Sequence, residues 1–272
     1  MDNRPIGVFD SGLGGLTAVK ELEEILPGES IVYFGDTGRV PYGTRSRDTV
    51  RRYAGQDMAF LMEHRVKAVL AACGTVSSTA KDIGERLPVR YFDVVDPTAR
   101  AALRLSRSKK IGITGTSATI HSGAYVKAIL ALDPQAQVYP KACPLFVPLV
   151  ESGFVDPQDE ITRLTVERYL APLRDAGVDV LILGCTHYPI IKEAIGRFMG
   201  PEVALVDSGR EAALALGGFL RENHMLCSQD NRRTAEYYVT DEPENFEASA
   251  RLFLGHSVEG KRIDIEKYSS LI

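Results

Sequence analysis

The sequence has no long hydrophobic run, no signal-peptide pattern at residues 1–6 and no excess of positive charge. No apolar stretch approaches the roughly 18 residues that a membrane-spanning helix requires. Residues 1–6 lack the basic-then-apolar order of a signal peptide, so we expect no membrane partner and a cytoplasmic location. The formal net charge is -4 and the pI is near 5.8. No nucleic-acid partner is expected, because nucleic-acid binding depends on clustered Lys and Arg.

Cysteine is also scarce, and its spacing is uninformative for metal binding. The four cysteines stand at positions 73, 143, 185 and 227, and no two of them are separated by only two residues. This is neither the spacing of a zinc knuckle nor that of a thioredoxin-like pair, so no metal site is predicted. In a reducing compartment all four are expected to be free thiols.

The apolar content that is present follows the pattern of an α/β protein. The 272 residues include 44% hydrophobic and 25% charged residues, enough for two lobes, with one larger domain as the alternative. Short Val, Ile, Leu and Ala runs are typical of parallel strands buried on both faces, and amphipathic segments lie between them. This order predicts a doubly wound fold whose ligands bind at the carboxyl ends of the strands. The expected strands are residues 6–9, 31–34, 68–72, 111–114, 180–183 and 203–206, and the expected helices include 17–26, 48–64 and 159–176.

The two halves of the chain resemble each other. Residues 6–9 match 111–114, and the strands that end at Cys73 and Cys185 also match, with offsets of about 105 and 112 residues. A chance likeness between short apolar runs is the alternative.

The repeat predicts two similar lobes whose parallel-rich sheets face each other across a cleft. The first lobe is expected to comprise residues 1–96 and 208–272, and the second 97–207. A helix at 210–224 is expected to return the chain to the first lobe, where 236–240 forms an edge strand.

Cys73 and Cys185 are candidates for a pair of acid/base groups. Inversion of a carbon that bears one hydrogen needs one group to remove a proton from one face and another to deliver a proton to the opposite face. Cysteine can do both if its surroundings bring its pKa, ordinarily about 8.5, near the operating pH. A lone cysteine is more often a small buried hydrophobe, the role we expect for Cys143 and Cys227, which have no matching partner.

Polar turns follow other predicted strands. The glycine-rich segment 10–15 lacks both the dinucleotide-binding spacing and a P-loop lysine, so no nucleotide is expected. Its Asp10 is suited to meet an ammonium group or to orient a thiol, and a simple turn with a helix-capping Ser11 is the alternative. Segment 36–43 is expected to form a cleft wall. His187 is either an acid/base partner of Cys185 or of substrate, or a structural histidine.

Taken together, six segments resemble the glutamate racemase family, within the aspartate/glutamate racemase superfamily. They occur in the family's order from residue 6 to about residue 209. They are Phe-Asp-Ser-Gly-Leu-Gly-Gly at 9–15, Gly-Asp-Thr at 35–37 with Val-Pro-Tyr-Gly at 40–43, Ala-Cys at 72–73 with Thr75, Gly-Thr-Ser-Ala-Thr at 115–119, Cys-Pro at 143–144 through Leu-Val-Glu at 149–151, and Leu-Gly-Cys-Thr-His-Tyr-Pro at 183–189.

The resemblance implies an enzyme that interconverts L- and D-glutamate by two-cysteine proton transfer and supplies D-glutamate for peptidoglycan. It implies no pyridoxal phosphate, metal or other cofactor, a small acidic amino acid as substrate, and compatibility with a homodimer. Cys73 and Cys185 match the paired bases, and Asp10 and His187 match their polar assistants. The implied substrate contacts are Asp10, Ser11, Tyr42, Gly43, Gly74, Thr75, Thr116, Thr119, Glu151, Thr186 and His187.

One position departs from the family. Its members usually have Asn directly after the first catalytic cysteine, and this chain has Gly74. The loss of one buried hydrogen bond to a charged ligand costs about 1.5 to 3 kcal/mol unless another donor substitutes. Two alternatives therefore stay open: a racemase of aspartate or another small α-substituted acid, and a catalytically weak amino-acid-binding homologue.

Overall fold

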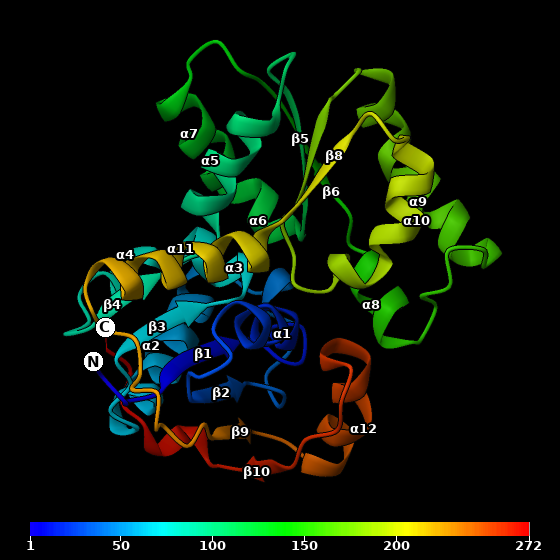
Figure 1. Ribbon diagram of the computed structural model, residues 1–272. Coiled ribbons are helices and arrows are strands. Elements are labelled where there is room, and N and C mark those ends of the chain that lie inside the picture. Colours follow the sequence, from blue (N-terminus) through cyan, green and yellow to red (C-terminus); the bar gives the residue numbers. More distant parts are fainter. Residues whose placement is uncertain (272) are drawn as a thin grey trace.

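The computed structural model describes residues 1–271, which form two α/β lobes, one above the other in Figure 1. The lower lobe holds a six-stranded sheet of order β10-β9-β2-β1-β3-β4, and the upper lobe a four-stranded sheet of order β6-β5-β7-β8. Every strand pair in this described part of the chain is parallel. The predicted architecture of two doubly wound lobes is confirmed.

The lower lobe is built from the first and last parts of the chain. Its strands are β1 (Ile6–Asp10), β2 (Ile31–Gly35), β3 (Ala68–Ala71), β4 (Arg90–Phe92), β9 (Ala235–Val239) and β10 (Gly260–Arg262). Its helices are α1 (Leu16–Ile25), η1 (Tyr42–Thr44, a 3₁₀ helix), α2 (Arg47–Glu63), α3 (Gly74–Thr79), α4 (Lys81–Gly84), α12 (Pro243–Leu254) and η3 (Ile265–Lys267).

The upper lobe comes from the middle of the chain. Its strands are β5 (Lys110–Gly115), β6 (Gln137–Ala142), β7 (Val180–Leu183) and β8 (Ala204–Asp207). Helices α5 (Val95–Leu105), α6 (Ser117–Ser122), α7 (Ala124–Leu132), α8 (Phe146–Glu151), α9 (Glu160–Asp175), η2 (Tyr188–Ile191) and α10 (Lys192–Met199) surround this sheet, and α11 (Ser208–Glu222) then leaves it.

The internal repeat is visible in the strand order. The central strand β1 pairs with β2 and β3, and β4 lies beyond β3; in the second sheet β5 pairs with β6 and β7, and β8 lies beyond β7. The order β2-β1-β3-β4 is therefore repeated as β6-β5-β7-β8, and the first sheet adds β9 and β10 at one edge. The resemblance between the two halves thus extends to their topology.

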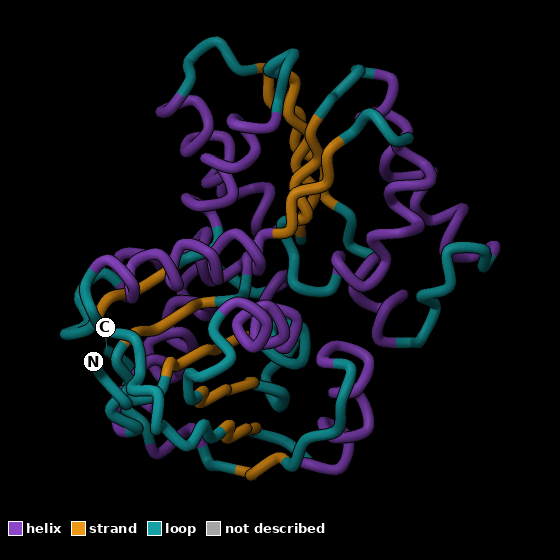
Figure 2. Tube along the Cα trace, in the orientation of Figure 1, coloured by secondary structure: helices purple, strands orange, loops and turns teal. Residues whose placement is uncertain are grey.

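The strands are apolar on both faces because helices cover both faces of each sheet. In β1 the side chains of Ile6 and Val8 pack into the core beneath α1, whereas Phe9 packs on the opposite face with Val50 and Met58 of α2. Figure 2 shows the two sheets in cross-section, with the helices on either side. The second sheet is likewise covered by α5 and α7 on one side and by α9 and α10 on the other.

After β8 the chain returns to the first sheet. Helix α11 packs against α1 and α5, and β9 then joins β2 in the first sheet. The expectation that residues 236–240 form an edge strand is wrong, because β10 pairs with β9 on its outer side. The lobe boundaries at 96/97 and 207/208 stay a prediction; the first of them falls inside α5.

No helix within residues 1–271 is both long enough and apolar enough to cross a membrane.

Candidate active site

A cavity of about 340 Å³ lies between the carboxyl ends of the two sheets. It is lined by turns that follow β1, β2 and β3 of the first lobe and β5 and β7 of the second. Of the predicted site residues it brings together Ser11, Tyr42, Gly43, Cys73, Gly74, Thr75, Thr116, Glu151, Cys185, Thr186 and His187. Asp10 and Thr119 are not among the described residues that line this cavity. Both side chains are buried behind the cavity wall.

The two cysteines occupy equivalent places in the two lobes. Cys73 follows β3 and is the N-cap residue of α3. Cys185 follows β7 after Gly184, whose N–H donates to the Thr114 carbonyl oxygen of β5. Both are free thiols and nearly buried, with 5% and 7% of their surface exposed. Thiols from both lobes thus share one cavity, as the sequence predicts for a pair of acid/base groups.

Cys73 lies in surroundings that favour its protonated form. Its thiol donates a hydrogen bond to Ser11 Oγ at 3.6 Å. Burial and the negative charge of Asp10 raise the pKa of the Cys73 thiol to about 12. The free site therefore holds Cys73 as a thiol at neutral pH.

Asp10 ends β1 and points its carboxyl group toward the turn that follows. Its Oδ2 accepts the Gly12 N–H at 3.1 Å, whereas its Oδ1 is buried and has no hydrogen-bond partner within the described chain. Burial raises the pKa of this carboxyl, although His187 and backbone N–H groups oppose the shift. A buried carboxylate oxygen without a partner is costly, which is typical of a functional position.

His187 connects Cys185 to a carboxylate of the second lobe. Its Nε2 lies 2.9 Å from Glu151 Oε1, and its ring packs edge-on against Phe253 of α12 with centroids 5.4 Å apart. Burial disfavours the charged imidazole, but hydrogen bonds with Cys185 and Glu151 outweigh it and raise the pKa of His187 to about 10. The imidazole can therefore hold a proton next to the Cys185 sulfur.

Threonine hydroxyls join the two lobes around the cavity. Thr75 Oγ1 and Thr116 Oγ1 are 3.0 Å apart and come from opposite lobes. Thr116 caps α6 by accepting the Thr119 N–H, and its hydroxyl also lies 3.0 Å from Thr119 Oγ1. On the other side, Thr17 Oγ1 donates to the Thr186 carbonyl oxygen at 3.0 Å.

The cavity wall formed by residues 36–43 is held in place by buried ion pairs and hydrogen bonds. Arg39 forms ion pairs with Asp36 at 2.6 Å and with Asp57 of α2 at 3.1 Å. The Tyr42 hydroxyl hydrogen-bonds to Asp36 and also lies 3.0 Å from Asp57 Oδ2. Burial and the nearby Asp36 raise the pKa of Asp57, which favours a proton on this carboxyl. The network holds the wall, including Gly43, against α2.

The cavity offers neutral hydrogen-bond donors for an anion. Among its described lining residues there is no Lys or Arg, but there are hydroxyls of Ser11, Thr75, Thr116 and Thr186. The backbone N–H groups at the start of α3 add further donors, because the first N–H groups of a helix lack partners within it. This lining suits a small acidic ligand held by hydroxyl and N–H groups.

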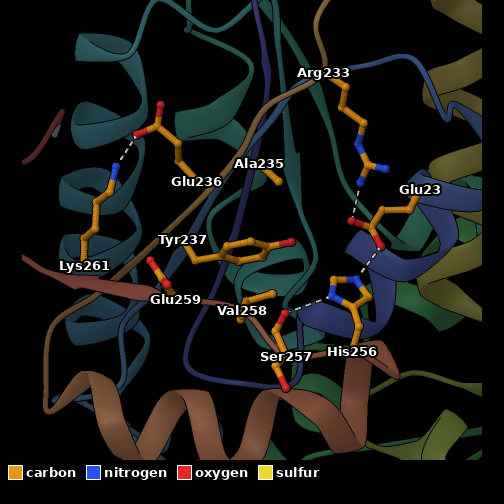
Figure 3. Close-up of a pocket in the computed structure, with 10 residues that line it drawn as sticks. All are labelled: Glu23, Arg233, Ala235, Glu236, Tyr237, His256, Ser257, Val258, Glu259 and Lys261. Carbon is orange, nitrogen blue, oxygen red and sulfur yellow. Dashed lines mark hydrogen bonds and ion pairs between the residues drawn. The ribbon is translucent and has the colours of Figure 1, made fainter.

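A second, larger cavity of about 670 Å³ lies at the far edge of the first sheet (Figure 3). Its charged groups are largely paired with one another. Glu23 bonds both Arg233 and His256, and Lys261 Nζ lies 2.9 Å from Glu236 Oε2. None of the ten described residues that line it is a cysteine. Proton transfer chemistry therefore points to the smaller cavity between the lobes.

Comparison with known proteins agrees with this geometry. The family model for Asp/Glu/Hydantoin racemase matches residues 6–216. The chain belongs to this racemase family. As a member of it, the protein is an isomerase.

Full-length relatives support the same assignment for this racemase. It is 46% identical over 260 residues to a glutamate racemase of Neisseria meningitidis, covering 94% of both chains. It is 44% identical over 267 residues to one of Geobacter metallireducens, covering 98% of this chain and 97% of the relative. The crystal structure of glutamate racemase from Francisella tularensis in complex with D-glutamate superimposes with a TM-score of 0.91 at 40% identity, covering 98% and 100% of the two chains.

The other two cysteines of the racemase lie outside the cavity lining. Cys143 is fully buried and donates to the Lys141 carbonyl oxygen at 3.6 Å, and burial raises its pKa. Cys227 is half-buried near Gly28. Cys143 is buried as expected, whereas Cys227 is only partly so. No group of three or more His, Cys, Asp or Glu side chains in the part of the chain that the structure describes could hold a metal ion.

Some lining residues were not singled out from the sequence. Val147 and Pro148 of α8 reach the cavity one turn before Glu151, and Leu13 also lines it. The spacing of Val147 and Glu151, four residues apart on one helix face, was the available signal. Apolar side chains carry no chemical signature, so only the fold identifies them as cavity walls.

Proposed function

We propose that this protein is a glutamate racemase that interconverts L- and D-glutamate by proton transfer between two cysteines. The observation that carries the proposal is that Cys73 and Cys185, from opposite lobes, line one small cavity. The named activity of relatives that match nearly the whole chain, and the D-glutamate bound in one of their structures, support glutamate as the substrate.

In the proposed reaction one cysteine is a thiolate and the other a thiol. The thiolate removes the proton from the α-carbon, and the electron pair of the broken C–H bond stays on the substrate. The opposite thiol then donates its proton to the other face of that carbon, which completes the inversion and exchanges the charge states of the two sulfurs. The same steps in reverse convert the second enantiomer.

The neighbours of each sulfur suit these roles. His187, with its raised pKa, can hold the proton that Cys185 releases, and Glu151 orients its ring. Asp10 stands behind Cys73, where its charge favours the protonated thiol. The ammonium group of a bound amino acid would offset that charge and ease the release of the Cys73 proton.

The substrate carboxylates would be held by neutral donors. We assign Ser11, Thr75 and Thr186 to this role, together with the backbone around Tyr42 and Gly43. Thr116 is a further donor, and Thr119 supports it from behind. The reaction needs no cofactor, because both proton carriers belong to the chain.

The product D-glutamate would serve peptidoglycan synthesis. We place the enzyme in the cytoplasm, where its catalytic thiols stay reduced.

The mechanism is tested with enzyme and L-glutamate in deuterated water. The wild-type protein should incorporate deuterium at the α-carbon of the D-glutamate formed, followed by mass spectrometry and polarimetry. Cys73→Ser and Cys185→Ser should each lower racemisation at least about 10²-fold, because a serine hydroxyl is a far weaker acid than a thiol and does not ionise near neutral pH to act as the base. Cys227→Ser is the matched control, since Cys227 lies outside the cavity, and it should keep wild-type activity. Normal turnover by either of the first two variants would exclude the two-cysteine mechanism.

Gly74 calls for a test of the substrate as well. Single enantiomers of glutamate, aspartate and other small α-substituted acids, compared by kcat/KM, should rank glutamate first. A higher kcat/KM for aspartate would show that aspartate is the preferred substrate, and the proposed mechanism would be unaffected. Binding of glutamate without hydrogen exchange would indicate a binding protein that has lost catalysis.

A further inference from the structure

Gly74 and Gly184 meet at the boundary between the lobes, and each is directly bonded to one of the two cysteines. Gly74 follows Cys73 at the start of α3, and Gly184 precedes Cys185 after β7. A Cβ atom at position 74 would stand less than 3.0 Å from the Gly184 carbonyl oxygen. Because that oxygen belongs to the backbone, it cannot rotate away as a flexible side chain could. Any side chain at position 74 therefore has to push the two turns apart.

The local backbone does not explain the glycine. The φ angle of Gly74 lies outside the positive region, so other residues can adopt this conformation. Alanine is also the better helix former by about 1 kcal/mol, and position 74 opens a helix. The close approach to Gly184 is thus the feature that requires the absence of a side chain.

Two other glycines of the first lobe also lie close to the second lobe, but they face its side chains. A Cβ atom at Gly14 would collide with Thr186 and His187, and one at Gly43 would lie 2.9 Å from Thr116 Cβ. The backbone of the first lobe therefore lies directly against the second lobe at several points around the cavity. Among these contacts, the one between Gly74 and Gly184 stands beside both sulfurs.

We infer that Gly74 is a positioning residue for racemisation: it lets the Cys73 turn lie against the Gly184 carbonyl and so sets the distance between the two sulfurs. This inference rests on the proposed function, since two-sided proton transfer needs both sulfurs close to one carbon. A displacement of about 1 Å can reduce such a reaction about 10²-fold. The residue therefore acts on the rate through the spacing of Cys73 and Cys185, beyond any contact that it makes with substrate.

Gly74→Ala tests the spacing with the smallest possible side chain. We expect kcat to fall about 10²-fold, with a much smaller change in KM. Gly218→Ala is the matched control, because Gly218 lies in α11 and a Cβ atom there has nothing within 4 Å; its kcat should equal that of the wild type. Circular dichroism and thermal melting should show that both variants are folded.

Deuterium labelling distinguishes a change in the distance between the sulfurs from a loss of folded protein. When the sulfurs are too far apart, the carbanion is more often reprotonated from the side that lost the proton. Where the thiol that took the proton exchanges it with deuterated water before returning it, the recovered L-glutamate carries label, and this label should rise relative to the label in D-glutamate. A smaller folded fraction lowers both signals together and leaves their ratio unchanged.

Gly74→Asn separates spacing from substrate contact. It carries the same Cβ atom as alanine and adds an amide that can hydrogen-bond to a ligand. The inference predicts that kcat falls in the Asn variant as it does in the Ala variant. A kcat for glutamate at or above the wild-type value in Gly74→Asn would overturn it, as would a kcat for Gly74→Ala within about twofold of the wild type.

Thiol cross-linking measures the spacing without catalysis, which keeps this inference distinct from the proposed function. Bis-methanethiosulfonate reagents of increasing span are applied in a Cys227→Ser background, and the Cys73–Cys185 cross-link is found by peptide mapping. The best span should be longer in Gly74→Ala than in wild type or Gly218→Ala, and equal spans would overturn the inference. Wild-type protein that leaves glutamate unchanged, while the spans differ as expected, would instead refute the proposed function alone.

Discussion

At the residue scale, the two sulfurs differ in the charge beside them. Cys73 has the carboxyl group of Asp10 behind it, and burial and that charge together raise its pKa. Cys185 has the imidazole of His187, whose own pKa is raised. The proton of Cys73 thus stays on its sulfur, whereas next to Cys185 the imidazole of His187 is a second group that can carry a proton.

Replacement of Asp10 by Asn should lower the pKa of Cys73. The carboxylate disfavours a second negative charge nearby, so its removal makes the thiolate easier to form. Because the thiolate is the reactive form, the pH midpoint of Cys73 alkylation by iodoacetamide should move to lower pH. The rate is measured by mass spectrometry in a Cys185→Ser, Cys227→Ser background, so that Cys73 is the accessible cavity thiol.

Asp230→Asn serves as the control for this measurement, because Asp230 is exposed and its loss should leave the midpoint in place. An unchanged midpoint in Asp10→Asn would mean that Asp10 carries no charge in the free site.

The sequence singles out the two cysteines that line the cavity, but not how closely their turns are packed. Cys73 and Cys185 could be predicted because strand ends and a repeated pattern are local signals. The approach of Gly74 to Gly184 could not, because residues 110 positions apart in the sequence come together only through the packing of the lobes. The resemblance to the family shows that position 74 lacks the amide of the usual Asn. The structure adds a steric reason for glycine at this position.

At the scale of elements, the segment between β2 and α2 is a cavity wall held by charge. Arg39 is the one cation that pairs with both buried carboxyls, Asp36 and Asp57, among the contacts of the described residues. Without it, two buried carboxyls would face each other. The wall that carries Tyr42 therefore depends on a residue that does not itself line the cavity.

Arg39→Met should destabilise the protein by about 3 to 5 kcal/mol, because it leaves buried acidic groups without their partner. The unpaired carboxyls then have folded-state pKa values above their unfolded values. Their protonated forms favour folding below the unfolded pKa, and that contribution is lost as pH rises through the folded pKa. The defect should thus be smaller at mildly acidic than at mildly alkaline pH, as measured by urea unfolding.

Asp57→Asn is the matched comparison in this network. Burial and Asp36 already favour a proton on Asp57. Replacement by the amide of the same shape should therefore lower the free energy of unfolding by about 1 kcal/mol or less. A larger loss in Asp57→Asn than in Arg39→Met would show that Asp57 is ionised in the folded protein.

The elements that the sequence predicted are those with continuous apolar runs. β1, β2, β3, β5 and β7 fall within one or two residues of expectation because they are buried on both faces, and the edge strand β8 does so because its apolar run is continuous. β6 escaped prediction because it is a half-buried edge strand that contains Pro140. β4 and β10 have only three residues each, too few for a periodic pattern. The burial of Asp57 in α2 could not be predicted locally, because it depends on contact with Arg39 and Tyr42 of the wall.

At the scale of the whole molecule, one apolar core runs through both lobes. It joins Ile6 and Leu22 of the first lobe to Leu170 and Leu181 of the second. Two further clusters fill the opposite faces of the two sheets. Because the chain also crosses between the lobes twice, neither lobe can lose its structure without exposing apolar surface of the other.

Thermal unfolding should therefore show a single calorimetric transition. Saturation with D-glutamate at about a hundred times its Kd should stabilise the folded state by about 2.7 kcal/mol, because the ligand binds only the folded molecule. D-lysine, which lacks the side-chain carboxylate, should have a much smaller effect. Two separate transitions, of which only one responds to D-glutamate, would show that the lobes unfold independently.

The matching strand orders place the two sulfurs on nearly equivalent scaffolds, whereas their polar neighbours differ. Mirror-image amino acids have the same free energy in water, so the equilibrium constant of a racemisation is one, and kcat/KM must be equal in both directions. The unequal surroundings of the sulfurs can then appear only in kcat and KM taken singly. Whichever enantiomer has the lower KM must be converted more slowly at saturation, by the same factor.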